Sequence, residues 1–181
     1  FSDAANKLKV QLASVSLDTA PSAEFGPAGL SFVLNHPRLT ISGAQLKSGS
    51  DSLGVSEVVI EAGQTRFVAA DTQLKLGIDE PHSTLNAVQL QLGGDTMEIG
   101  RSEIASDTLS LTQDGGDTRI EATVVRTALS NFQAQRNTNR INVRDASFAT
   151  RSISFANGVD ARFDDVTLKL KSADVAALDP P

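Results

Sequence analysis

Apolar residues recur at every second position in several short segments that begin with Asp or Asn and end at Gly or another polar residue. The clearest copies span 71–77, 86–93, 107–111 and 165–170. Because side chains alternate across a β-strand, each copy places a pair of apolar residues on one face and Ser, Thr, Gln or Lys on the other. The pattern predicts an antiparallel sheet with one apolar and one hydrated face.

Turn residues between these segments predict hairpins. Four-residue loops are expected at 93–96 and 114–117, and a three-residue loop at 156–158 with Gly158 in the left-handed position. Each loop keeps the apolar residues of its two strands on one face. The expected cross-strand pairs are Leu92–Met97, Leu90–Ile99, Gln113–Thr118, Leu111–Ile120, Leu109–Ala122, Phe155–Val159 and Ile153–Ala161.

Three other segments carry weaker signals. The alternation slips by one residue at 13–14, which predicts a bulge, and residues 35–38 are a further hairpin candidate. Residues 128–132 could form a helical turn. The two Gly-Gly-Asp-Thr tetrads lie 22 residues apart, but the apolar phase after them differs, so no fixed repeat is expected.

These signals predict one all-β module over residues 1–181, elongated and with little helix. An antiparallel meander with this many strands must curl, split into two layers or close. The alternatives are a β-sandwich or jelly roll and a bent, open-ended β-groove. The chain begins at Phe1 rather than Met, so we expect a processed product or a module excised from a longer chain.

Composition excludes several function classes. The net charge is -6 and the basic residues are scattered, which argues against binding to nucleic acid or to anionic lipid headgroups. Trp and Tyr are absent, so the rings on which sugars usually stack are missing and carbohydrate is not an expected partner. Cysteine is also absent, and no apolar run reaches the roughly 20 residues of a transmembrane helix.

Candidate chemistry is sparse. His36 and His82 both lie beside Pro in turn-like segments, without the spacing of metal ligands, and we expect surface histidines. Asp residues beside Gly are typical of turns. No nucleophile elbow or phosphate loop is present. The sequence therefore predicts no catalytic residues, no metal and no cofactor. A hydrolase would need several loop carboxylates to converge in one cleft.

The apolar stripe is the remaining candidate site. It either packs against a second layer as ordinary core or lines a slot for acyl chains, where each methylene removed from water contributes roughly 0.8 kcal/mol. The candidate ligand-binding residues are Leu74, Leu76, Leu90, Leu92, Leu109, Leu111, Phe148, Phe155, Phe163, Leu168 and Leu170.

The C-terminal part resembles the AsmA/TamB-type proteins of the bacterial envelope. The resemblance covers residues 140–175, where Asp-Ala-Ser-Phe (145–148) is followed by a strand and then by Asp-Asp-Val-Thr-Leu (164–168). It implies a periplasmic module of a curved β-groove that carries lipid between membranes. The family has no catalytic residues to carry over, and no anchor helix is present in this sequence.

We therefore expect a non-enzymatic module of the periplasm or cell envelope that shelters lipid acyl chains or stacks end to end with like modules. The alternative is a structural or adhesive module of a cell-surface or secreted protein, with a fully packed core. A rise in melting temperature with calcium would favour a metal-stabilised form of that alternative.

Overall fold

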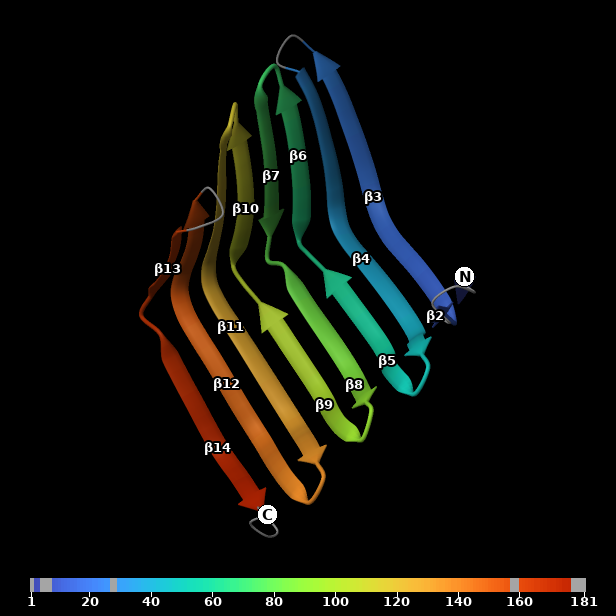
Figure 1. Cartoon of the computed structure of the whole chain (residues 1–181). Helices are drawn as coiled ribbons and strands as arrows, with labels where there is room; N and C mark the ends of the chain where they lie inside the picture. Colours follow the sequence, from blue (N-terminus) through green and yellow to red (C-terminus); the bar gives the residue numbers. More distant parts are fainter. Residues whose placement is uncertain (1, 4–7, 27–28, 157–159, 177–181) are drawn as a thin grey trace.

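The computed structural model describes residues 2–3, 8–26, 29–156 and 160–176, and these residues form one antiparallel sheet (Figure 1). The described part of the chain contains no helix, and so none that could cross a membrane. The strands are β1 (Ser2–Asp3), β2 (Leu8–Gln11), β3 (Ser14–Gly26), β4 (Gly29–Ser48), β5 (Asp51–Glu61), β6 (Gln64–Ala70), β7 (Gln73–Asp79), β8 (His82–Leu92), β9 (Asp95–Ala105), β10 (Thr108–Asp114), β11 (Asp117–Arg136), β12 (Asn139–Ala156), β13 (Asp160–Asp164) and β14 (Thr167–Ala176).

The strands join into eight long lines that run side by side along an up-and-down meander (Figure 1). β4, β11 and β12 are continuous, whereas the other lines are broken into two strands placed end to end. In chain order the lines are β2 with β3, β4, β5 with β6, β7 with β8, β9 with β10, β11, β12, and β13 with β14. The all-β antiparallel prediction is confirmed.

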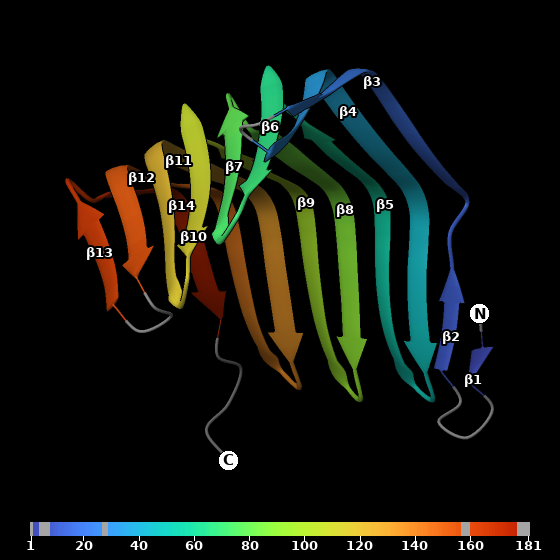
Figure 2. The ribbon, with the colours of Figure 1, turned by 90° about the horizontal axis from the view of Figure 1, so that it is seen from above.

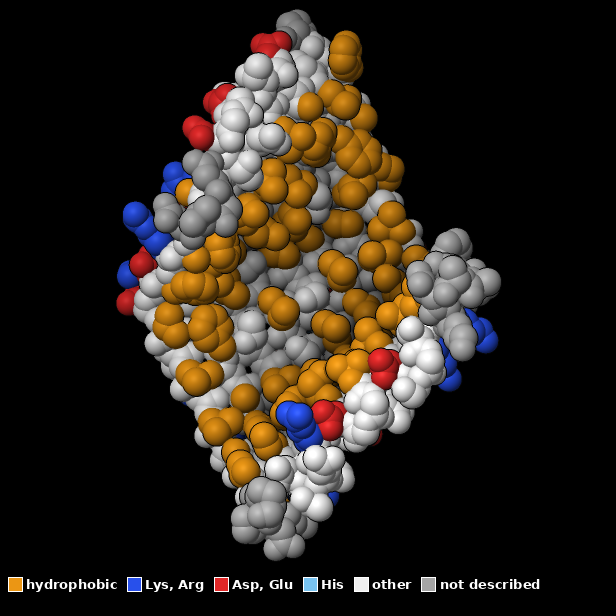
Figure 3. Space-filling model, viewed as in Figure 1, with side chains coloured by type: hydrophobic (Ala, Val, Ile, Leu, Met, Phe, Trp, Pro, Cys, Tyr) orange, Lys and Arg blue, Asp and Glu red, His pale blue; other side chains and the backbone are white. Residues whose placement is uncertain are grey.

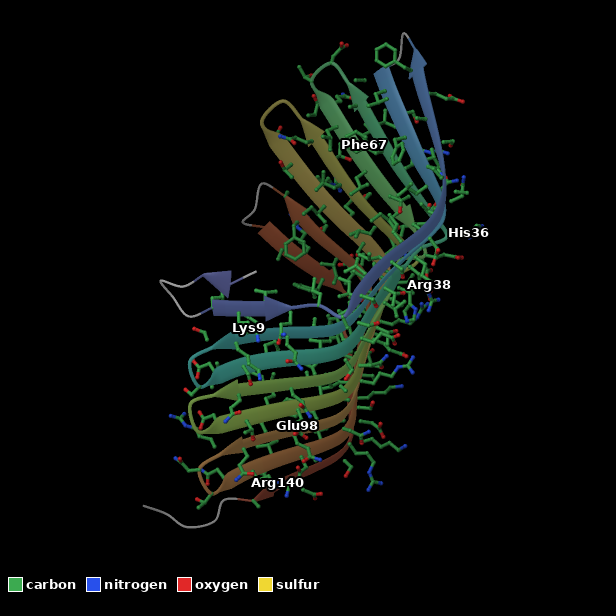
Figure 4. The ribbon with its side chains drawn as sticks, turned by 90° about the vertical axis from the view of Figure 1, so that its right-hand side faces the viewer. Lys9, His36, Arg38, Phe67, Glu98 and Arg140 are labelled. Atoms are coloured by element: carbon green, nitrogen blue, oxygen red, sulfur yellow. The ribbon has the colours of Figure 1, made fainter. Side chains whose placement is uncertain are left out.

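The sheet bends along one row of residues that crosses the lines, which we call the first interruption. It contains the breaks after β5, β7, β9 and β13, and in the continuous strands it falls at His36, Val124 and Arg151, the first two with positive φ. Above it lies an upper arm and below it a lower arm, and the two arms lean toward the same side (Figures 2 and 4). The sheet is therefore a trough rather than a flat layer.

A second row without ladder pairing crosses the lower arm, and we call it the second interruption. Its members are Gly43, Ser56, Ala87, Gly100, Asn131 and Arg144. Gly43, Ala87 and Asn131 have positive φ. On the first line the same row falls at Ala13, whose N–H donates to the Ser42 carbonyl at 3.0 Å. The irregularity predicted at 13–14 is confirmed.

The second interruption shifts the alternation of the lines by an odd number of residues, and so does the first except on the first line, where Leu17 and Pro21 are four apart and a bulge between Asp18 and Ala20 absorbs the difference. Across the second, apolar positions are three apart, as in Ile41 and Ala44. Across the first they are five apart, as in Leu34 and Leu39. Because neighbouring lines shift at the same place, the apolar rows stay aligned across the sheet.

The hairpin turns are evenly spaced. Gly49, Asp71, Gly93, Gly115 and Asn137 each begin a two-residue turn with positive φ, and each lies 22 residues from the next. The expectation of no fixed repeat is therefore wrong. The distance from a turn to the next apolar residues differs between successive turns, because successive turns lie at opposite ends of the lines. A strand of the upper arm also differs in length from a strand of the lower arm.

Two of the three predicted turns differ from the structure in register. The pairs around Gly115 are as predicted, although the loop is two residues long because Asp114 and Asp117 also pair. At Gly93 the loop is again two residues, so Leu90 pairs with Met97. In each case the apolar residues still share a face, because the register changes by an even number.

The third loop is shifted along the chain. Ala156 pairs with Asp160, and Phe155 pairs with Ala161 rather than with Val159. The connecting residues 157–159, including the left-handed Gly158, lie outside the described residues.

Two other local predictions are wrong. Residues 35–38 are not a hairpin, because β4 runs through them and only bends at His36 (φ 48°). Residues 128–132 are not a helical turn but part of β11, where Asn131 (φ 53°) belongs to the second interruption. In both segments the turn-forming residues serve a local distortion of a continuing strand.

No second layer covers the sheet within the described residues. The only buried apolar side chains among the described residues are Val59, Val88 and Val125. The chain exposes 12112 Å² of surface, whereas a compact protein of 19.0 kDa exposes about 8,400 Å². Of the predicted alternatives, the structure is the bent groove and not a sandwich, a jelly roll or a sealed core.

Candidate apolar groove

The concave face of the trough is apolar over both arms (Figure 3). In the upper arm three rows of directly paired residues run across the lines. They are Phe25–Leu30–Ala69–Leu74–Gln113–Thr118, Ala23–Phe32–Phe67–Leu76–Leu111–Ile120–Phe155–Ala161 and Pro21–Leu34–Thr65–Ile78–Leu109–Ala122–Ile153–Phe163.

Four similar rows cross the lower arm. They are Leu17–Leu39–Ile60–Ser83–Ile104–Thr127–Phe148–Leu168, Val15–Ile41–Val58–Leu85–Ser102–Leu129–Ala146–Leu170, Ala44–Val55–Val88–Ile99–Phe132–Val143–Ala173 and Val10–Leu46–Leu53–Leu90–Met97–Ala134–Ile141–Val175. None of the seven rows contains an acidic or basic residue. The seven rows are therefore uncharged from one edge of the sheet to the other.

A cavity of about 520 Å³ lies in the angle between the arms. Its walls come from both arms and from the first to the seventh line, and Glu61 and His82 contribute at the first interruption. They include Leu39, Ile60, Ile78, Ile104, Leu109 and Phe155. Residues of the upper and lower rows therefore face the same space across the first interruption.

The predicted site residues all belong to the apolar rows or to their rim. Leu74, Leu76, Leu109, Leu111, Phe155 and Phe163 lie in the upper arm, and Leu90, Leu92, Phe148, Leu168 and Leu170 lie in the lower arm. Leu92 is at the rim, where it pairs with Asp95. Of these, Leu109 and Phe155 line the cavity.

Sequence reasoning missed most of the cavity wall. Leu17, Leu39, Ile60, Ile78, Ile104, Ile120 and Ile153 line it but were not among the candidates. Many flank the first interruption, next to residues read as turns or breaks. The signal that could have found some of them is the five-residue interval between apolar positions, as in Leu34 and Leu39, Ile104 and Leu109, and Phe148 and Ile153.

The opposite, polar face carries several exposed ion pairs. Arg38 contacts Glu61 at 2.7 Å, Arg119 contacts Glu121 at 2.6 Å, and Arg151 contacts Asp165 at 2.7 Å. Such pairs contribute little to stability because both partners remain hydrated. Their role in the fold is to keep one face in water while the other stays apolar.

Both histidines lie at the first interruption near Glu61. His82 Nδ1 is 3.2 Å from Glu61 Oε1, and His36 and His82 line a shallow depression of about 360 Å³ together with Arg38 and Glu80. His36 and Arg38 project from the convex side of the bend (Figure 4). Among the described residues, no group of three or more His, Asp or Glu is arranged to hold a metal ion.

Comparisons with known proteins gave no match to this chain. No family model matches the chain, and no curated protein or solved structure matches it.

Proposed function

We propose that the chain is a non-enzymatic module of the bacterial periplasm or cell envelope whose trough shelters the acyl chains of lipids. The observation that carries the proposal is the concave face, which no described residue covers and whose seven rows carry no charge, with its mostly apolar cavity between the arms. The resemblance of residues 140–175 to AsmA/TamB-type proteins supports the same role.

The dimensions of the trough suit an acyl chain. Eight lines spaced by about 4.8 Å make a floor roughly 34 Å long across the strands. One leaflet of a bilayer is about 15 Å of hydrocarbon, so two chains could lie end to end along the floor. Burying a dozen methylenes would contribute roughly 10 kcal/mol before the entropic costs of binding. The polar headgroup would stay outside, because the rows offer it no charge.

A structural or adhesive module remains the second candidate function. The packed core expected for it is not what the sheet has, so the apolar face would need a cover from outside the described residues. Lipid loading separates the two functions, because an adhesive module has no reason to take up free lipid in its trough.

The absence of Trp and Tyr gives a clean test of lipid binding. Ile60→Trp would place a single indole in the cavity wall, whereas Gln89→Trp would place one on the polar face. With dioleoyl phosphatidylethanolamine we expect a blue shift and quenching by a brominated analogue for Ile60→Trp only. Equal responses of the two variants, or none, would remove the lipid role.

A loss-of-binding pair checks the same site. Ile104→Glu introduces a charge into the cavity wall, and Gln89→Glu introduces the same charge on the polar face. In native mass spectrometry of detergent-free protein, we expect lipid adducts to fall at least tenfold for Ile104→Glu and to be unchanged for Gln89→Glu. Loading that is equal in both variants would contradict the proposal.

A further inference from the structure

The sheet ends in two edge strands whose other side has no partner within the described residues. β3 pairs only with β4, and β13 and β14 pair only with β12. Only the rim end of the first line is covered, where β1 pairs with Leu8 and Lys9 of β2. Long unpaired edges are ready templates for another strand.

The most exposed apolar side chains of the trough gather at these edges. In the row from Val15 to Leu170, the two end residues are 56% and 59% exposed, whereas the members between them are half-buried. Phe25 on β3 is 87% exposed and Leu168 on β14 is 75% exposed. Among the described residues, each edge therefore lacks the second neighbouring line that every inner line has.

The directions of the two edges fit one another. β3 runs up the sheet and β13 with β14 runs down, so a copy placed beside the first would bring the two edges together antiparallel (Figure 1). This repeats the relation of each line to the next inside the chain. Both interruptions would then continue unbroken into the second copy.

Register and charge agree with this arrangement. Continuing the rows places Leu17 of one copy beside Leu168 of the other, and Val15 beside Leu170. On the polar face Lys169 falls beside Ser16 and diagonal to Asp18, within reach of an ion pair. Pairing β3 with β3 about a two-fold axis would instead set the lower arm of one copy beside the upper arm of the other.

We propose that β3 of one molecule pairs with β13 and β14 of a second copy, so that the chains join head to tail into one continuous trough. The contact uses different surfaces on the two partners, so it leaves a free edge at each end and growth is open-ended. It does not depend on lipid and can be tested separately from the lipid role.

A disulfide trap tests the register, because the chain has no cysteine of its own. Ser16→Cys with Lys169→Cys should give a ladder of dimers, trimers and larger species on non-reducing gels. The matched pair Ser16→Cys with Arg162→Cys, where residue 162 lies seven residues from residue 169 along the same edge, should give no ladder. Dimers from Ser16→Cys alone would indicate two-fold pairing and overturn the proposal.

Sedimentation velocity of the full chain gives a readout without crosslinking. We expect the mean mass to rise with concentration, and Leu168→Lys to weaken association at least tenfold. Leu46→Lys makes the same change on the apolar face of an inner line and should associate as the wild type does. A protein that stays monomeric up to millimolar concentration, with no ladder from the in-register pair, would overturn the proposal.

Discussion

Gly100 and Asn131 face one another across β9 and β11, and a Cβ built on Gly100 would lie 2.9 Å from the Asn131 Cβ. Real Cβ atoms do not approach so closely, so a side chain at residue 100 must push the two lines apart. The second interruption therefore depends on a small residue at this position.

We expect Gly100→Ala to lower the free energy of unfolding by about 1–3 kcal/mol, because overpacking forces backbone shifts. For a chain of this size, each kcal/mol corresponds to roughly 2–4 °C in melting temperature. Gly54→Ala in β5 is the control, since a Cβ there meets nothing within 4 Å. Thermal unfolding of both variants checks the prediction, and equal losses would contradict it.

Val124 holds a left-handed conformation (φ 50°) at the first interruption, which is strained for a β-branched residue. Val124→Asn should raise the stability by about 1 kcal/mol, because Asn tolerates this region better. Val33→Asn, on the polar side of β4 with ordinary φ, should instead lose stability through lower strand propensity. Urea unfolding should show opposite signs for the two variants.

Thr150 is the most buried polar residue described, at 3% exposure. Its hydroxyl donates to the Asp164 carbonyl at 2.5 Å and lies 3.1 Å from the Ser152 carbonyl. Thr150→Val should cost about 0.5–1.5 kcal/mol, because the part-buried hydrogen bond to the Asp164 carbonyl would be lost. Thr150→Ser keeps the hydroxyl and should retain most of that stability. Chemical denaturation separates the two, and similar losses would mean that packing, not the hydrogen bond, matters here.

Glu61 accepts from Arg38 and lies beside His82, but its side chain is 37% exposed. We expect Glu61→Gln to change the free energy of unfolding by less than about 1 kcal/mol, because an exposed pair gains little over hydration. The small effect should shrink further at high salt. A loss well above this limit in urea titrations at neutral pH would show that the cluster at the bend has a structural role.

The sequence was most informative where a strand is regular. The alternation around Leu109 and Leu111 predicts the face and also the register with Ile120, because a glycine-containing turn and an apolar pattern agree there. Around Leu92 the pattern predicts the face but not the register. A shift by two residues leaves the same side chains on the same face, so hydrophobicity alone does not distinguish the two.

The interruptions were hidden for a different reason. Residues such as His36 beside Pro37, or Asn131 after Ser130, favour a turn when only their neighbours are considered. In the sheet they lie in line with similar residues from other strands, and the chain continues past them. Only the pairing register of strands far apart in the sequence shows that these residues form a transverse row, and local sequence does not contain that information.

The even spacing of the turns has a consequence for how such a protein can change in size. Duplicating 44 residues would add one hairpin, which widens the sheet by about 10 Å while the cross-section of the trough stays the same. Deleting a single residue from one line would, by contrast, move the apolar side chains beyond the deletion to the polar face. The number of hairpins in the sheet can therefore change during evolution. The number of residues in each hairpin is fixed, because each hairpin must pair with its neighbours.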